Sequence, residues 1–295
     1  MSVAFQRVGF IGLGVMGEPM CRNLCRKAGL PVHVHDIHEQ AVGRVLNDGA
    51  VAHQSVRDLA GHAEVVFLSL PSIDHVEQVC LGVDGLLSGE RKPRLIVDTG
   101  TSDVARTRAL AVRLAEQGVR FLDAPVARMP EAARDGTLLI MVGGAQEDLD
   151  AVRPLLDCMG SDVVLCGGTG CGQIVKIANN MVLMMNVAVL AETLLICERA
   201  GIDGKQLLDV LSTGSAASQA LNVVGIRALA PREFSQGRFS TAYALKDVSL
   251  AASLAEASGV DAAILARTRE LLQSAVAQGD GQAYFPILIN QIATK

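Results

Sequence analysis

A polar stripe in an otherwise apolar segment is the feature of this sequence that most suggests chemistry. The segment GQIVKIANNMVLMMNVAVL, residues 172–190, contains a single charge, Lys176. On a helix with about 100° per residue, this lysine shares roughly a third of the circumference with Gln173, Asn179 and Asn180. A solvated face would mix Lys, Glu and Arg, so the pattern indicates the wall of an enclosed site.

A second motif, near the amino terminus, has the spacing of a dinucleotide-binding turn. In VGFIGLGVMGEPM, a short apolar run leads into GxGxxG and then into a predicted helix. The glycines permit a tight turn and a close approach of the backbone to a pyrophosphate, whose charge the start of the helix stabilises. The residues expected to contact the cofactor are Gly12, Leu13, Gly14, Val15, Met16 and Gly17.

An acidic residue stands where a dinucleotide site selects its cofactor. The next predicted strand ends at Asp36, nineteen residues after Gly17, where a carboxylate can accept hydrogen bonds from the adenine ribose of NAD. The same charge would repel the 2′-phosphate of NADP, and the adjoining Ile37 offers no guanidinium to bind one. We therefore predict NAD as the cofactor.

The elements that must position these motifs divide the chain into two parts. Up to about residue 165, short apolar runs typical of covered strands alternate with amphipathic helical stretches. From about Gly168 the strand pattern stops and long helical stretches follow. We predict an α/β fold with a Rossmann-like doubly wound sheet in residues 1–166, a long interdomain helix, and an all-helical domain in residues 167–295.

Composition narrows the partners and the compartment. The chain is 3% aromatic, has no Trp and carries a formal net charge of -5, which argues against nucleic acid and anionic membrane as main partners. Seven cysteines, an odd number with no CxxC pair, fit reduced thiols in a cytoplasmic protein. The amino terminus lacks a basic region and polar residues interrupt the longest apolar run, so neither a signal peptide nor a membrane-spanning helix is expected.

Three histidines lie close together in PVHVHDIHEQ. His33, His35 and His38 have no cysteine or acidic ligand set beside them at metal spacing. Ordinary histidines at the end of a strand explain the pattern, and no metal site is predicted.

Several stretches together resemble the β-hydroxyacid dehydrogenase family, which includes 3-hydroxyisobutyrate dehydrogenase and tartronate semialdehyde reductase. They span essentially the whole chain: GFIGLGVMGEPM, LP at 70–71, VDTGT at 97–101, DAPV at 123–126, GTLLIMVGG, GCGQIVKIANN and LKD at 245–247. The resemblance implies an NAD-dependent oxidoreductase that interconverts a short 3-hydroxy acid and its semialdehyde by hydride transfer. It also implies a helical second domain that binds substrate and helps form homodimers or homotetramers.

The resemblance assigns roles by position. Lys176 matches the family's catalytic lysine, a general acid/base, and Asn180 matches its polar neighbour and substrate ligand. Leu70, Pro71 and Thr101 match loop positions that line the cofactor.

The chemistry supports Lys176 independently. Oxidation of an alcohol needs a base within hydrogen-bond reach of the hydroxyl. All six histidines precede residue 76, and of the lysines in the second half only Lys176 stands in an apolar, asparagine-lined segment. A lysine that reaches solvent past small residues, or one held by a buried carboxylate, would explain the same pattern without catalysis.

Lys246 matches the family residue that reaches the cofactor from the second domain. For Lys246 and Asp247, an exposed helical pair is the alternative interpretation. For Thr101 the alternative is a helix cap or a hydroxyl at the end of a strand.

The residues after DAPV depart from the family. Where its members usually continue Ser-Gly-Gly, which holds the substrate carboxylate, this chain has Ala127, Arg128 and Met129. We predict that these three contact the substrate and that Arg128 binds its acid group, a pattern similar to that of sulfolactaldehyde reductases. A guanidinium suits a sulfonate or a second carboxylate. A sulfolactaldehyde-type or dicarboxylic semialdehyde reductase is thus the alternative function, and an arginine exposed to solvent is the alternative placement.

Two further alternatives stay open. Imine reductases share this architecture, although they typically lack a lysine at the catalytic position. An NAD-binding protein without turnover would also fit the cofactor half, but Lys176 and Asn180 argue against it.

Overall fold

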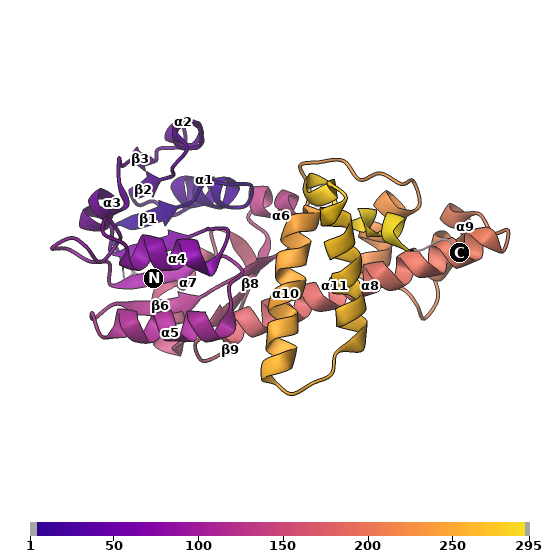
Figure 1. Ribbon diagram of the computed structural model, residues 1–295. Helices are drawn as coiled ribbons and strands as arrows, with labels where there is room; N and C mark the ends of the chain where they lie inside the picture. The colour runs from indigo at the N-terminus through magenta and orange to yellow at the C-terminus, as the bar shows by residue number, and fades with distance from the viewer. Residues whose placement is uncertain (1–4, 293–295) are drawn as a thin grey trace. The chain divides into compact units, whose positions relative to one another are not determined.

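The computed structural model describes residues 5–292 and divides into two compact units. The first unit runs to Lys176 and holds all of the described strands, and the second begins at Ile177 and is helical (Figure 1). Helix α8 (Cys171–Arg199) is continuous through the boundary.

Within the described residues, the strands of the first unit form one sheet in the order β3-β2-β1-β4-β5-β6-β8-β7, with β9 paired to β8. Its members are β1 (Val8–Ile11), β2 (Val32–His35), β3 (Val51–Ala52), β4 (Val65–Leu68), β5 (Leu95–Asp98), β6 (Arg120–Asp123), β7 (Val126–Ala127), β8 (Leu138–Gly143) and β9 (Gly160–Gly167). The pairs from β3 to β6 are parallel, whereas β8 runs antiparallel to β6 and β7. The chain moves outward from β1 to β3 and then returns to β4, which confirms the predicted doubly wound sheet.

Helices cover both faces of this sheet. Alternate strand residues point to opposite sides, so Val65 and Phe67 join one core while Val66 and Leu68 join the other. The first core is covered by α1 (Gly17–Lys27), α2 (Glu39–Leu46), α6 (Pro130–Asp135) and α7 (Gln146–Leu156). The second is covered by α3 (Val56–His62), α4 (Ile73–Leu81) and α5 (Val104–Ala115).

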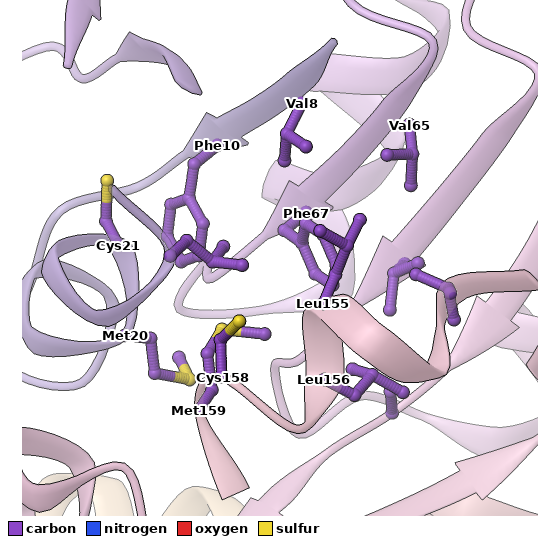
Figure 2. Close-up of a cluster of buried hydrophobic side chains, with 14 of the residues drawn as sticks. Val8, Phe10, Met20, Cys21, Val65, Phe67, Leu155, Leu156, Cys158 and Met159 are labelled. Atoms are coloured by element: carbon purple, nitrogen blue, oxygen red, sulfur yellow. The ribbon is translucent and has the colours of Figure 1, made fainter. Parts of the chain in front are cut away.

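Figure 2 shows the first core. Phe10 of β1 and Phe67 of β4 are register partners, and their rings stack with centroids 6.2 Å apart. Met20 and Cys21 of α1 approach from one side and Leu155 of α7 from another. Full burial of aromatic and aliphatic side chains on neighbouring strands fixes the strand register, since a slip of one residue would move them to the other face.

The second unit consists of helices, as predicted. After α8 come α9 (Gly204–Leu211), the π-helical segment η1 (Ala220–Leu229), α10 (Thr241–Ala257), α11 (Ala263–Ala277) and the 3₁₀ segments η2 (Asp280–Gln282) and η3 (Phe285–Gln291). Helices α10 and α11 pack against each other, and η3 packs on α11. The sequence did not predict η1, whose bonds run five residues back, as from the Ala230 N–H to the Gly225 carbonyl at 3.0 Å.

Candidate active site

The ends of four neighbouring parallel strands lie in one row. Their last residues pair in register: Ile11, Leu68, Asp98 and Asp123. The segments that follow them carry most of the predicted site residues: Gly12 to Gly17, Leu70 and Pro71, Thr101, and Ala127 to Met129. Ligands of doubly wound sheets bind at the carboxyl ends of the strands where the strand order reverses, which here is between β1 and β4. The fold therefore brings these predicted residues to the edge where a dinucleotide binds.

The three glycines after β1 differ in what a side chain would meet. Gly12 has φ +94°, and a Cβ there would lie 2.3 Å from the Ser69 carbonyl oxygen. At Gly17 a Cβ would lie 2.0 Å from the Gly12 carbonyl oxygen. At Gly14 it would meet nothing within 4 Å. Gly12 thus makes the turn, Gly17 allows α1 to pack closely, and Gly14 leaves open space beside the start of a helix, which fits a pyrophosphate.

The other residues of this turn divide between core and surface. Leu13 is buried, Val15 is 71% exposed, and Met16 is the half-buried cap of α1. The turn therefore presents mainly backbone to a ligand. The contacts of these side chains with the cofactor stay a prediction.

Asp36 is bound to the glycine turn. One of its oxygens accepts the Leu13 N–H at 2.6 Å, and the other accepts the His38 N–H at 2.8 Å. Each carboxylate oxygen keeps a lone pair that a ribose hydroxyl can use. The adjoining Ile37 is 85% exposed, so the chain provides no cation at that position for a 2′-phosphate.

A buried carboxylate holds the first turn of α8. Asp123, fully buried at the end of β6, accepts the Gly170 N–H at 2.7 Å and the Gln173 N–H at 2.9 Å. Burial raises the pKa of Asp123, and these backbone bonds oppose that rise. The first N–H groups of a helix have no partners within it, so Asp123 both satisfies them and fixes where α8 begins.

Gln173 ties the same helical turn to the segment after β5. Its amide nitrogen donates to the Gly100 carbonyl and its amide oxygen accepts the Ser102 N–H, both at 2.9 Å. The two partners flank Thr101. Lys176 follows three residues later, on the same side of α8. The helix that carries the predicted catalytic lysine is therefore fixed to two of the strand ends.

The sequence alone indicated no role for Asp123 or Gln173. It placed Gln173 in the polar stripe and Asp123 in a family motif. The available signal was the spacing of three between Gln173 and Lys176, which indicates a shared face but not a partner. The partners are distant in sequence, 71 residues away for Ser102 and 47 for the Gly170 bond to Asp123.

The helix-cap interpretation of Thr101 and the exposed-pair interpretation of Lys246 and Asp247 are wrong, whereas a strand-end hydroxyl at Thr101 stays open. Helix α5 is capped by Asp103, which accepts the Arg106 N–H at 2.8 Å, so Thr101 is not its cap. The side chain of Asp247 is 4% exposed, so Lys246 and Asp247 are not an exposed pair, although their charged groups lie 3.0 Å apart.

In the second unit, Asn180 is bound to Asp247. The Asn180 amide donates to the Asp247 carboxylate at 2.6 Å, and its oxygen accepts from the Asn179 amide at 3.0 Å. One N–H of Asn180 remains for another acceptor. The predicted reach of Lys246 to the cofactor stays a prediction.

The guanidinium of Arg128 has partners on β9 and before β8. It donates to the Asp162 carboxylate at 2.7 Å, to the Ser161 hydroxyl at 2.9 Å and to the Thr137 carbonyl. Its backbone has φ +89°, a region that favours glycine, which is the residue that the resemblance implies at this position. These contacts weigh against an anchor for the substrate's acid group, because Arg128 would have to leave Asp162.

The two neighbours of Arg128 differ in burial. Ala127 is buried in the short strand β7, and Met129, 39% exposed, precedes α6. The predicted substrate contacts of all three residues stay predictions.

Comparison with known proteins agrees with this geometry. Residues 7–168 match the family of the NAD binding domain of 6-phosphogluconate dehydrogenase, and residues 170–291 match that of the NAD-binding part of NADP-dependent 3-hydroxyisobutyrate dehydrogenase. The chain is 35% identical over 286 residues to 2-hydroxy-3-oxopropionate reductase of Escherichia coli (strain K12), which covers 97% of both chains. It is 33% identical to 2-(hydroxymethyl)glutarate dehydrogenase of Eubacterium barkeri, covering 94% of this chain and 91% of that one.

A solved structure gives the same result for the fold. The 3-hydroxyisobutyrate dehydrogenase of Mycobacterium tuberculosis, described with L-serine, superposes with a TM-score of 0.87 at 29% identity, covering 98% of this chain and 99% of that one. The fold, the site and these relatives define an NAD-dependent oxidoreductase. The chain belongs to the β-hydroxyacid dehydrogenase family.

Proposed function

We propose that this protein interconverts a short 3-hydroxy acid and its semialdehyde, with Lys176 as the general acid/base. The observation that carries the proposal is the fixing of the first turn of α8, by Asp123 and Gln173, to the strand ends where the dinucleotide binds. Lys176 follows Gln173 by three residues, on the same side of the helix, which supports its assignment. The names of the relatives, an oxopropionate reductase and hydroxy-acid dehydrogenases, support this substrate class.

The residues of the chain supply the proton transfer and the orientation. The glycine turn after β1 and Asp36 would hold NAD, which would supply the hydride acceptor for oxidation and, as NADH, the hydride donor for reduction. In oxidation the neutral amine of Lys176 takes the hydroxyl proton, and in reduction its ammonium returns a proton to the same oxygen. Asn180, one helical turn further along α8, offers its remaining N–H to the substrate.

Replacement of the lysine tests this assignment. Lys176→Ala is expected to bind NADH as wild type does and to lose about two to four orders of magnitude in turnover. Turnover would be measured on C3 to C5 hydroxy acids and semialdehydes, including dicarboxylic and sulfonated ones. Lys205→Ala is the matched control, since that lysine is exposed on α9 and paired with Asp209. Near-normal turnover of Lys176→Ala would end the proposal.

A dicarboxylic or sulfonated semialdehyde is the second candidate substrate. Arg128 and the name of the Eubacterium barkeri relative favour it, whereas the contact of Arg128 with Asp162 opposes it. If Arg128 anchors an acid group, Arg128→Ala raises KM by about tenfold or more with NAD affinity unchanged, the loss expected for a charged hydrogen bond. Asp162→Ala would then lower KM by freeing the guanidinium. A KM unchanged by both variants places Arg128 outside the substrate site.

We also propose a homodimer or homotetramer. Three large apolar side chains recur every seven residues along α8, and Val182, Val189 and Ile196 are 51%, 52% and 67% exposed. Helix α8 is long and apolar enough, by length and composition, to span a bilayer, yet only 39% of its most apolar stretch is buried. The exposed apolar face of α8 therefore needs a partner. Light scattering should report a multiple of 31.0 kDa for wild type and a monomer for Val189→Asp.

We propose a cytoplasmic location as well. The seven free cysteines support a reducing compartment of this kind.

A further inference from the structure

Several histidine rings lie close together beside strands β2 and β3. They are not on the loops after β1, β4, β5 and β6, which carry most of the predicted active-site residues. His53 directly follows β3, and Asp58 and His62 stand one turn apart on α3. Each of the three offers a ligand atom within 4.8 Å of the others. We propose that His53, Asp58 and His62 bind a divalent transition-metal ion of the Zn²⁺ class.

The distances between donor atoms suit such an ion after a small closure. The Nδ1 atom of His53 lies 2.8 Å from one oxygen of the Asp58 carboxylate, and the Nδ1 atom of His62 lies 3.6 Å from the other. The His62 Nδ1–H also donates to the Asp58 backbone carbonyl at 2.9 Å, a bond that an ion on this nitrogen would replace. Ligand atoms around tetrahedral Zn²⁺, each about 2.0–2.1 Å from the ion, lie about 3.3 Å from one another. The ligand atoms, which lie within 4.8 Å of one another, must therefore approach by at most about 1.5 Å.

The exposure of the three side chains allows this closure. The His53 side chain is 7% exposed and fixed, whereas those of Asp58 and His62 are 49% and 54% exposed. A hydrated ion can reach the two outer ligands, which move toward the inner one. Water fills the fourth position, as in zinc sites with three protein ligands.

A fourth histidine supports the inner ligand. The Nδ1 atom of buried His33 lies 2.8 Å from the Nε2 atom of His53. A histidine that binds metal through one nitrogen usually donates the N–H of the other to a neighbouring acceptor. With His53 Nδ1 on the ion, its Nε2–H donates to His33, a positioning residue.

The donor set also suits such an ion. His53, Asp58 and His62 present two imidazole nitrogens and one carboxylate oxygen, and Zn²⁺ binds both kinds of ligand.

The ion would strengthen the connection between the edge strand β3 and helix α3. Strand β3 has only two residues, both exposed, at the edge of the sheet. His53, directly after β3, already hydrogen-bonds Asp58 of α3 at 2.8 Å, and an ion shared by His53, Asp58 and His62 would strengthen this link. The site is therefore structural, and its test is independent of the dehydrogenase activity.

Titration of the metal-free full chain tests the site. Protein without a histidine tag is stripped with chelator and titrated with Zn²⁺ by calorimetry and with Co²⁺ by visible absorption. We expect one ion per chain, with affinity lowered more than tenfold in His62→Ala and in Asp58→Ala. His33→Gln should lower it by about tenfold, the loss seen when a supporting hydrogen bond to a ligand is removed. His75→Ala, on the exposed side of α4, is the matched control and should bind as wild type does.

The outcomes separate this site from other sites for the ion. The seven free cysteines could also bind Zn²⁺, so the comparison of wild type with the variants, and not Zn²⁺ binding alone, identifies the site. Equal affinity in wild type, His62→Ala and Asp58→Ala would overturn the proposal, and so would a Co²⁺ spectrum dominated by thiolate bands. Melting curves give a second readout, because Zn²⁺ should raise the Tm of wild type and of His75→Ala but not of the other two variants.

Discussion

The segment after β1 and the segment after β6 lie at the same edge of one sheet, yet they keep their shape in opposite ways. The first relies on missing side chains, since a Cβ at Gly12 or Gly17 would overlap a carbonyl oxygen. The second has a side chain where the backbone favours glycine, and the guanidinium of Arg128 holds it with three hydrogen bonds. A positive φ can thus be tolerated by having no side chain or stabilised by a well-bonded one.

The difference has a consequence for function. A turn built from backbone leaves its N–H groups and its open space for a ligand, as at Gly14. In a turn held by its own side chain, the N–H donors of that side chain already bind acceptors within the protein. The glycine turn is therefore prepared for its ligand, whereas the turn at Arg128 would have to rearrange to bind one.

The largest effect is expected within the glycine turn. Gly17→Ala should lower the free energy of unfolding by about 3 kcal/mol, because its Cβ would lie 2.0 Å from a carbonyl oxygen and α1 would have to move. Gly14→Ala should leave stability nearly unchanged and weaken NAD binding by about tenfold or more, because its methyl fills the open space. Urea unfolding and NADH fluorescence titration measure the two quantities. Equal loss of stability in both variants would contradict the division of roles.

An intermediate effect is expected at the acidic residue that binds the glycine turn. Asp36→Ser combined with Ile37→Arg should shift the preference from NAD toward NADP by about 10- to 100-fold, since it removes the repelling charge and adds a guanidinium at an exposed position. The ratio of kcat/KM for the two cofactors measures this. Wild type that already favours NADP would refute the role given to Asp36.

The smallest effect is expected at the turn held by its side chain. Arg128→Ala loses the hydrogen bonds and keeps a Cβ at φ +89°, whereas Arg128→Gly loses the bonds and relieves the strain. The glycine variant should be more stable than the alanine variant by about 1 kcal/mol. Thermal unfolding of the pair measures the difference, and an alanine variant as stable as the glycine variant would show that the backbone is not strained there.

The sequence by itself determined the features that depend on local pattern. The period of the apolar residues, the glycine spacing after β1 and Asp36 nineteen residues later were sufficient for the doubly wound sheet, the helical second unit and the dinucleotide cofactor. These features are readable because strands, helices and glycine turns are set by neighbours close in the chain.

Only the tertiary structure decided which side chains are partners across long separations. It showed that Asp123 and Gln173 fix the helix of Lys176, and that Arg128 binds Asp162. It also showed that His53, Asp58 and His62 lie close to His33, whereas in the sequence His33 has only His35 and His38 as neighbouring histidines. A hydrogen bond or a metal ligand set depends on distance in space, and the packing of strands on helices fixes that distance independently of the separation along the chain.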